Sequence, residues 1–400
     1  MSSRMDSGSS SERLHALDLV RAGALLAGIV YHASLSMLPG VSAWLVMDVA
    51  RSPAVAALTF ILHSFRMATF FLLAGYFGRM VLLRRGTGAF VSDRVRRILV
   101  PFAIFLAAQL ALFAAALFLG VQTGAVTLGP GFSLWNYLSP ANIPLLHLWF
   151  LYVLLILYAA MLGLHRLAEI LDPDGRLRAG VDRVFGWLLG GFRLPALLAL
   201  PAAALLLLQP GWLEFWGVIA PDTGLLPAPA PLGIYFLALG CGWMLHRQNG
   251  ALASLARHWA GNLATACVAS AAALWMVGTQ IVPAPLFAGG ERIVYACLYG
   301  AMMWFWTFAA IGAALRFLRR PNRTARYLAD SSYWLYLIHL PLVMGLQMLV
   351  APWPLPAPAK LALVVAAAMM LMLASYQWLV RDHAIGRMLS GRKRPGRVAG

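Results

Sequence analysis

Runs of about 20 apolar residues recur along the whole chain, and a helix of this length spans a lipid bilayer. Hydrophobic residues make up 61% of the 400 residues and charged residues only 11%, against roughly 25% in soluble domains. The net charge of +17 lies in short segments between apolar runs, which is the pattern of membrane topology and not of a nucleic-acid partner. The sequence therefore predicts an all-α, polytopic membrane protein.

Ten apolar runs are candidates for transmembrane helices. Their predicted ranges are 16–38, 54–83, 98–119, 144–167, 192–208, 232–245, 263–282, 293–315, 333–350 and 361–380. The fifth and sixth runs are short, and the fifth contains Pro195 and Pro201. Proline interrupts the hydrogen bonding of a helix, so these two spans are the weakest of the set.

Basic residues alternate between the connections that join these runs. Five arginines lie between the second and third runs, and five lie in the connection between the fourth and fifth or at its edges, whereas segments 121–143 and 209–231 carry none. Because loops rich in Lys and Arg stay in the cytoplasm, we expect an even number of spans and two cytoplasmic termini. The predicted organisation is a disordered cytoplasmic N-terminus (1–13), a ten-helix membrane domain (14–381) and a basic cytoplasmic tail (382–400).

The first apolar run contains two ionisable side chains, Arg21 and His32, in addition to Asp18 at its start. Eleven residues are about three turns of helix, so Arg21 and His32 project from nearly the same face, roughly 16 Å apart along the axis. Ionisable groups are costly within a membrane and commonly mark a functional site. A local ion pair between Arg21 and Asp18 is the alternative explanation.

Further ionisable residues form a series across the predicted membrane. From the cytosolic side, the series contains Arg94, Arg97, Arg21, Arg66, His339, His63, His32 and His147. Such a series suits a long substrate with an anionic head inside and a reactive end delivered outward, which is the shape of acyl-CoA. Arginine binds phosphate as a bidentate fork, and histidine near neutrality is a suitable general base for a hydroxyl.

Other interpretations account for the same residues. Histidines in membrane helices can simply hydrogen-bond to neighbouring helices, and the arginines at 84–97 would be needed for topology alone. A glycan or lipid transporter or flippase is a second functional class, although the middle of the spans carries no Asp or Glu for proton coupling. A non-catalytic membrane scaffold is a third. The cysteines Cys241, Cys267 and Cys297 show no paired spacing, and we expect no metal site.

Five segments, taken in order, carry a family resemblance. They are Arg21 and His32 separated by ten residues, 63–77 (HSFRMATFFLLAGYF), Arg94 and Arg97 followed by Pro101, 147–151 (HLWFL) and 332–339 (SYWLYLIH). In this set the chain resembles integral-membrane acyltransferase family 3, bacterial enzymes that O-acylate extracytoplasmic glycans, over about residues 13–380. It is most similar to the branch that succinylates periplasmic glucans. Ala74 departs from the pattern, because family members often have serine before the glycine.

The resemblance implies a multi-pass protein of the bacterial inner membrane that moves an acetyl or succinyl group from cytosolic acyl-CoA to a hydroxyl of an extracytoplasmic glycan. Arg94 and Arg97, with Arg21, would hold the CoA. Acyl-CoA is then a co-substrate, and no permanently bound cofactor is expected. The partners implied are the lipid bilayer, acyl-CoA and a periplasmic or surface glycan.

The resemblance also implies roles near the reacting atoms. His32 would be the general base, and a transient acyl group on His32 is the alternative chemistry. Arg66 or His63 would stabilise the developing oxyanion. The remaining family segments imply substrate contacts at His147, Trp149, Tyr333 and His339.

Overall fold

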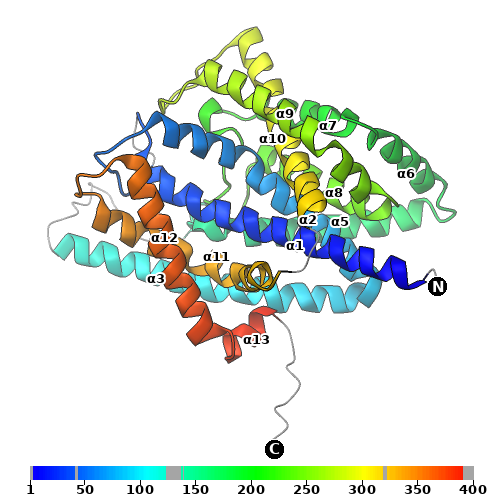
Figure 1. The fold of residues 1–400 in the computed structure, drawn as a ribbon, viewed down its shortest axis with the longest axis horizontal. Helices are drawn as coiled ribbons and strands as arrows, with labels where there is room; N and C mark the ends of the chain where they lie inside the picture. Colours follow the sequence, from blue (N-terminus) through cyan, green and yellow to red (C-terminus); the bar gives the residue numbers. More distant parts are fainter. Residues whose placement is uncertain (1–2, 41–43, 123–136, 138, 319–321, 391–400) are drawn as a thin grey trace, which may run out of the picture.

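The computed structural model describes residues 3–40, 44–122, 137, 139–318 and 322–390, and within them it is built from helices without a strand (Figure 1). The α-helices are α1 (Ser3–Ser34), α2 (Pro53–Arg94), α3 (Val100–Gln122), α5 (Trp149–Leu171), α6 (Arg176–Leu188), α7 (Arg193–Leu207), α8 (Pro229–Arg247), α9 (Ala251–Val277), α10 (Gly289–Phe317), α11 (Arg323–Val350), α12 (Ala357–Ser375) and α13 (Ala384–Ser390). Shorter turns are η1 (Leu35–Met37), η3 (Leu146–Leu148) and η4 (Glu214–Trp216), and η2 (Val95–Leu99) and η5 (Tyr376–Val380) are π-helical.

Each of the ten predicted ranges contains a helix, and the chain is a multi-pass membrane protein. Seven helical stretches of the described residues are long and apolar enough to span a bilayer, or eight if the bent pair α6 and α7 counts as one span. One of the seven, Pro53–Ala115, covers both the second and the third predicted spans. The number ten and the cytoplasmic placement of both termini stay predictions.

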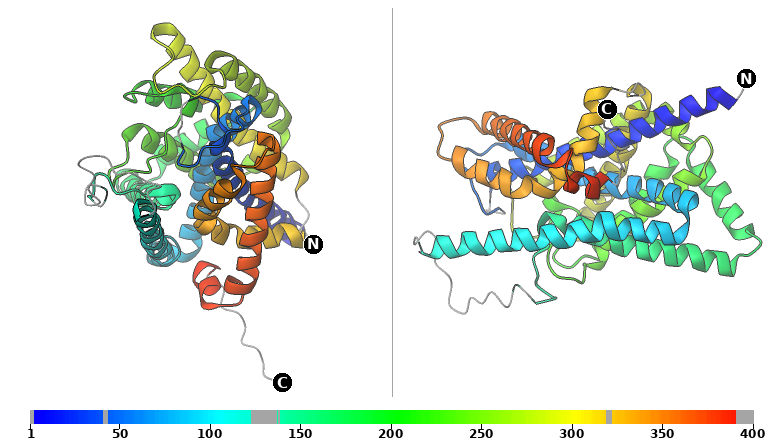
Figure 2. Two further views of the ribbon diagram at one scale, coloured as in Figure 1. Left: turned by 90° about the vertical axis from the view of Figure 1, so that its left-hand side faces the viewer. Right: turned by 90° about the horizontal axis from the view of Figure 1, so that it is seen from below.

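Gly86 marks a break between the second and third predicted spans within the stretch Pro53–Ala115. Its φ of 76° lies in the left-handed region, which glycine adopts without steric penalty, and it interrupts the helical geometry inside α2. The helix resumes directly and continues through η2 into α3. In the right-hand view of Figure 2, α3 is seen as a long helix beside α5.

Both ends of the chain differ in part from the sequence expectation. Helix α1 begins at Ser3, so most of the segment predicted to be disordered is helical. Adding a residue to an existing helix forms one more backbone hydrogen bond, which favours this extension. At the other end, residues 384–390 of the predicted basic tail form α13, and residues 391–400 lie outside the described part.

Small residues allow close approach of the helices around the centre. A Cβ atom at Gly75 of α2 would collide with the carbonyl oxygen of Leu239 of α8, and one at Gly242 of α8 would collide with that of Leu72. Such reciprocal glycine contacts are typical of tightly packed membrane helices. They fix α2 closely against α8.

A buried ion pair holds the segment after α1 in place. Nζ of Lys360, at the start of α12, donates to Oδ1 of Asp48 at 2.7 Å, and both side chains are almost completely buried. The backbone N–H of Asp48 in turn donates to the carbonyl of Ser36. The C-terminal end of α1 is therefore anchored to α12 through this segment.

Candidate active site

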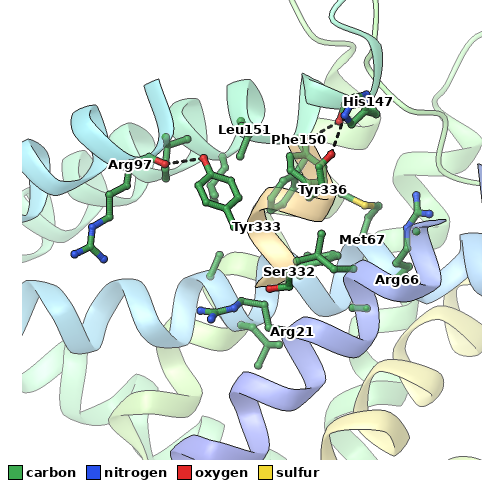
Figure 3. A pocket seen from close by; sticks show the side chains of 18 of the residues that line it. Arg21, Arg66, Met67, Arg97, His147, Phe150, Leu151, Ser332, Tyr333 and Tyr336 are labelled. Atoms are coloured by element: carbon green, nitrogen blue, oxygen red, sulfur yellow. Dashed lines mark hydrogen bonds between the residues drawn. The ribbon is translucent and has the colours of Figure 1, made fainter. Parts of the chain in front are cut away.

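A cavity of about 380 Å³ lies between α1, α2, η2, α5 and α11. This volume falls within the range of roughly 300–1,000 Å³ that is typical of small-molecule sites. Nine of the ten site residues predicted from the sequence line it: Arg21, His32, Arg66, Arg94, Arg97, His147, Trp149, Tyr333 and His339. Figure 3 shows Arg97 on one side of this cavity, Arg66 and His147 on the other, and Tyr333 and Tyr336 between them.

Three histidines from separate elements meet at what we call the histidine end of the cavity: His32 of α1, His147 of η3 and His339 of α11. Nδ1 of His32 and Nε2 of His339 are 2.9 Å apart and share a hydrogen bond. The ring centroids of His147 and His339 are 4.6 Å apart, and those of His32 and His147 are 6.4 Å apart. Two residues of the first and ninth predicted spans are thus in direct contact.

The backbone of α11 organises this end. The carbonyl of Tyr336 accepts hydrogen bonds from Nε2 of His147 at 2.9 Å and from Nδ1 of His339 at 2.7 Å. The hydroxyl of Tyr336 donates to the carbonyl of His147 at 2.7 Å (Figure 3). Tyr336 and His147 are therefore joined by reciprocal hydrogen bonds.

Pro341 within α11 leaves a neighbouring carbonyl without its helical partner. Proline has no N–H, so the carbonyl of Leu337, four residues earlier, cannot form the usual helical hydrogen bond. Nε2 of the buried Gln109, on α3, donates to this carbonyl at 3.0 Å. The proline thus provides the acceptor through which α3 is joined to α11 beside the histidine end.

The turn that carries His147 is conformationally strained. Leu146, the preceding residue, has a φ of 52°, and no other non-glycine residue of the described part has a positive φ. Bulky residues rarely adopt this conformation, and such strain is often found at functional sites. The backbone N–H of Leu145 donates to the carbonyl of Asp222 at 2.7 Å, which helps to hold the turn in place.

Arg66 is a buried cation in the wall of the cavity. Its side chain is only 6% exposed, and its guanidinium lies 4.4 Å from the ring centroid of Tyr31. Within the described residues, Nη1 has no hydrogen-bond partner and no carboxylate lies within ion-pair distance of the guanidinium. A cation held in this way remains able to interact with a negative charge that enters the cavity.

His63 is the one predicted site residue that does not line the cavity. Its ring stacks on Tyr31 with centroids 5.0 Å apart, and its Nε2 is 3.2 Å from the carbonyl of Val218. Tyr31 also contacts the guanidinium of Arg66, so this tyrosine is a shared neighbour of the two side chains. A contribution of His63 to the site would therefore pass through Tyr31.

The opposite end, which we call the arginine end, contains Arg21, Arg94 and Arg97. Asp93 interacts with Arg97 at 3.0 Å and with Arg94 at 3.4 Å, and Arg21 forms an ion pair with Asp18 at 3.1 Å. The π-helical turn η2 begins directly after Arg94 and includes Arg97. Interruptions of this type are frequent at functional sites.

Comparison with protein families matches residues 14–377 to the acyltransferase domain of acyltransferase family 3. The chain belongs to this family. It is thus a membrane acyltransferase that transfers groups other than aminoacyl groups.

Curated relatives are similar over part of the acyltransferase. The glucans biosynthesis proteins C of Escherichia coli strains SMS-3-5 and K12 are both 31% identical to it over 148 residues. These matches cover 37% of this chain and 37% of the relatives' own length. No solved structure matches the acyltransferase significantly.

Several residues of the site were not predicted from the sequence. These are Tyr336, whose carbonyl accepts from His147, Gln109, which donates to a carbonyl of α11, and Asp93, which pairs with Arg97. Their contacts use backbone groups or join elements that are distant in the chain. Pro341 was the available signal, because a proline inside an apolar span identifies a carbonyl that needs another donor. Ala74 lines the cavity, and its carbonyl accepts a hydrogen bond from the hydroxyl of Tyr158.

The three histidines do not form a metal centre. Among the described residues, no group of three or more His, Cys, Asp or Glu side chains has an arrangement that could hold a metal ion. Both ring nitrogens of His339 are already hydrogen-bonded within the protein.

Proposed function

We propose that this acyltransferase moves an acetyl or succinyl group from cytosolic acyl-CoA to a hydroxyl of an extracytoplasmic glycan at the bacterial inner membrane. The observation that supports this most strongly is that one cavity joins an arginine end to a histidine end. Arg21 and His32 lie on the same helix, roughly 16 Å apart along its axis, and both line the cavity. An extended donor with phosphates at one end and a thioester at the other fits a cavity with arginines at one end and histidines at the other.

The arginine end is the proposed binding site for the CoA phosphates. Arg94 and Arg97 share Asp93, and Arg21 has its own acidic partner, Asp18. In each case a phosphate oxygen would take the place of a carboxylate oxygen beside a guanidinium, and arginine binds both groups with similar geometry. The cations are thus held in position before the donor arrives.

His32 is the proposed general base. The acceptor oxygen forms an ester bond to the thioester carbonyl carbon while its proton passes to His32. The carbon–sulfur bond then breaks, and His32 returns the proton to the sulfur of CoA. General-base catalysis of this kind contributes about 10²–10⁴ in rate. In the alternative chemistry, His32 itself carries the acyl group between donor and acceptor.

Arg66 is the proposed stabiliser of the oxyanion that forms during acyl transfer. It is buried in the cavity wall without a carboxylate partner in the described residues, so its charge is available to the reacting group. A fixed positive charge in a site shielded from water stabilises a developing negative charge strongly. His63 would support Arg66 indirectly, by packing against Tyr31.

The acceptor is proposed to be a glycan, in line with the names of the curated relatives. Those relatives are called glucans biosynthesis proteins, and the match covers 37% of their length. His147, Trp149 and Tyr333 line the cavity and are the proposed contacts for the donor or acceptor. His339, also in the wall, has both ring nitrogens engaged within the protein.

Mass spectrometry of surface and periplasmic glycans from a deletion strain and a complemented strain would identify both the acyl group and the acceptor. Proteoliposomes with the purified protein, isotope-labelled acyl-CoA and that acceptor would then test the reaction. We expect labelled glycan from the wild type and about 10²–10⁴-fold less from His32→Ala. Unchanged acylation by His32→Ala would reject the catalytic assignment.

Glycan movement across the membrane without consumption of acyl-CoA would indicate the transporter alternative. A labelled acyl adduct on His32 that turns over when the acceptor is added would favour the covalent route.

A further inference from the structure

His32 is part of a chain of hydrogen bonds that ends on the backbone of α11. Its Nδ1 is 2.9 Å from Nε2 of His339, and Nδ1 of His339 is 2.7 Å from the carbonyl oxygen of Tyr336. The same carbonyl accepts Nε2–H of His147 at 2.9 Å. The imidazoles of His32, His339 and His147 are thus linked through the carbonyl of Tyr336 in one series of hydrogen bonds beside the cavity.

The chain of hydrogen bonds determines where the protons lie. A carbonyl oxygen can only accept, so Nδ1 of His339 carries a hydrogen and donates it to Tyr336. In a neutral imidazole the other nitrogen then has a lone pair, so Nε2 of His339 is an acceptor. His32 must therefore donate from Nδ1. Its own Nε2 is left with a lone pair, which is the form that a general base requires.

The charges around the pair favour a neutral His339. The fixed cation Arg66 lines the same cavity, and the ring of His147 lies 4.6 Å from that of His339. His147 donates its Nε2–H to the carbonyl that also accepts from His339. It is therefore not an anionic partner that would stabilise a protonated His339. No acidic side chain of the described residues forms an ion pair with either histidine. A second proton on His339 would place another cation in a buried site that already contains one.

We propose that His339 is a positioning residue that fixes the tautomer and orientation of His32, so that Nε2 of His32 is the basic atom presented to the substrate. This inference rests on the proposed role of His32 as general base. After His32 takes the acceptor proton, its Nδ1–H still donates to Nε2 of His339, which stabilises the imidazolium that forms. His339 thus acts through His32, and the backbone carbonyl of Tyr336 takes the place of the carboxylate that commonly orients a catalytic histidine.

Two substitutions separate this role from a merely structural one. In His339→Gln, the side-chain oxygen reaches the position of Nε2 and can still accept from His32. In His339→Asn, the shorter amide can still donate to the carbonyl of Tyr336 but does not reach His32. We expect His339→Asn to lower kcat about 10²-fold with little change in KM for acyl-CoA, because a base without its orienting partner can adopt the wrong tautomer. We expect kcat of His339→Gln to be about tenfold higher than that of His339→Asn.

A spectroscopic measurement tests the hydrogen bond independently of activity. Nitrogen-15 NMR of histidine-labelled protein in nanodiscs, with the His32 signals assigned by their loss in His32→Ala, reports which ring nitrogen carries the proton. We expect a protonated Nδ1 in the wild type and in His339→Gln, and a protonated Nε2 in His339→Asn.

The outcomes distinguish the two hypotheses. A wild-type His32 protonated on Nε2, or equal kcat values for His339→Asn and His339→Gln, would overturn the positioning role and leave the function of His32 intact. Full activity of His32→Ala would reject the proposed function, while the NMR signals would still decide whether His339 fixes the tautomer.

Discussion

The two ends of the cavity hold positive charge in opposite ways. At the arginine end, the side chains of Arg21 and Arg97 are 43% and 35% exposed, and each interacts with an aspartate. At the histidine end, Arg66 is 6% exposed and has no carboxylate partner in the described residues. A paired, solvated arginine is inexpensive to maintain and can exchange its partner for a ligand. A buried cation without such a partner is expensive, and its charge acts on whatever enters the site.

This difference separates binding from chemistry along one cavity. Groups at the arginine end should determine how tightly the donor is held, because they interact with it equally in the ground state and in the transition state. Groups at the histidine end should determine the rate of transfer, because the charge that they stabilise appears only during the reaction. Substitutions at the two ends are therefore expected to affect different kinetic constants.

Among the substitutions that compare the two ends of the cavity, Arg66→Met is expected to have the largest effect. Removing the proposed oxyanion stabiliser should lower kcat about 10²–10³-fold. Because methionine also removes a buried cation that lacks a carboxylate partner, Tm should stay the same or rise. Steady-state acyl transfer in proteoliposomes and thermal unfolding of the same preparations would measure both.

Arg79→Met is a matched control on the same helix. Arg79 lies in α2, outside the cavity, and its Nη1 is 2.9 Å from Nδ1 of His246. This variant should lose Tm and keep kcat, which is the reverse pattern. A parallel loss of Tm and unchanged kcat in Arg66→Met would show that Arg66 serves the fold rather than the reaction.

A smaller effect is expected at the arginine end. Arg94→Gln and Arg97→Gln should each raise KM for acyl-CoA about 10- to 100-fold with little change in kcat, since one charge-assisted hydrogen bond contributes roughly 1.5–3 kcal/mol. The difference from wild type should shrink as salt screens the phosphate charges. Titration of the initial rate with acyl-CoA at two ionic strengths would measure both changes.

Arg85→Gln is the control for the arginine end. Arg85 also approaches Asp93, at 3.9 Å, but its side chain is exposed and does not line the cavity. Its KM should equal that of the wild type. If Arg85→Gln raised KM as much as Arg97→Gln, the general basic charge of this loop, and not the cavity, would attract the donor.

Much of the fold and the site was predictable because each depends on local sequence. Apolar runs located a helix in all ten expected ranges, and the spacing of Arg21 and His32 placed both side chains on one wall of one cavity. The depth order of the ionisable residues in the membrane, which rests on helix lengths and loop charges, stays a prediction. The identity of nine lining residues followed from motifs that are themselves continuous in sequence.

The lateral arrangement of the helices was not predictable from one sequence. Nothing in the pattern around His339 indicates that its imidazole meets His32 instead of a substrate, since the contact depends on how α1 packs against α11. His63 shares a face of α2 with Arg66 but does not line the cavity, because its ring packs against Tyr31 and Trp216. The break at Gly86 falls in the connection predicted between the second and third spans, but the return to helix directly after it was not predicted.

The smallest expected effects come from two tyrosines that lie one turn apart on α11, between the two ends of the cavity, and whose hydroxyls bond to residues of opposite ends. The hydroxyl of Tyr333 donates to the carbonyl of Arg97, and that of Tyr336 donates to the carbonyl of His147, both at 2.7 Å (Figure 3). Replacing either residue by phenylalanine removes one hydroxyl and retains the ring, at a cost of about 0.5–1.5 kcal/mol. The two variants are therefore matched in chemistry and differ only in the end of the cavity that they disturb.

If the two ends have separate tasks, the same small change should appear in different kinetic constants. Tyr333→Phe loosens the backbone that carries Arg97 and should raise KM for acyl-CoA about two- to tenfold, with kcat retained. Tyr336→Phe loosens the turn that carries His147 and should lower kcat by a similar factor, with KM retained. Initial-rate measurements on both variants in one lipid composition would compare them directly. Equal changes of kcat and KM in the two variants would mean that α11 transmits either disturbance along the whole cavity, and the division between binding and chemistry would not hold.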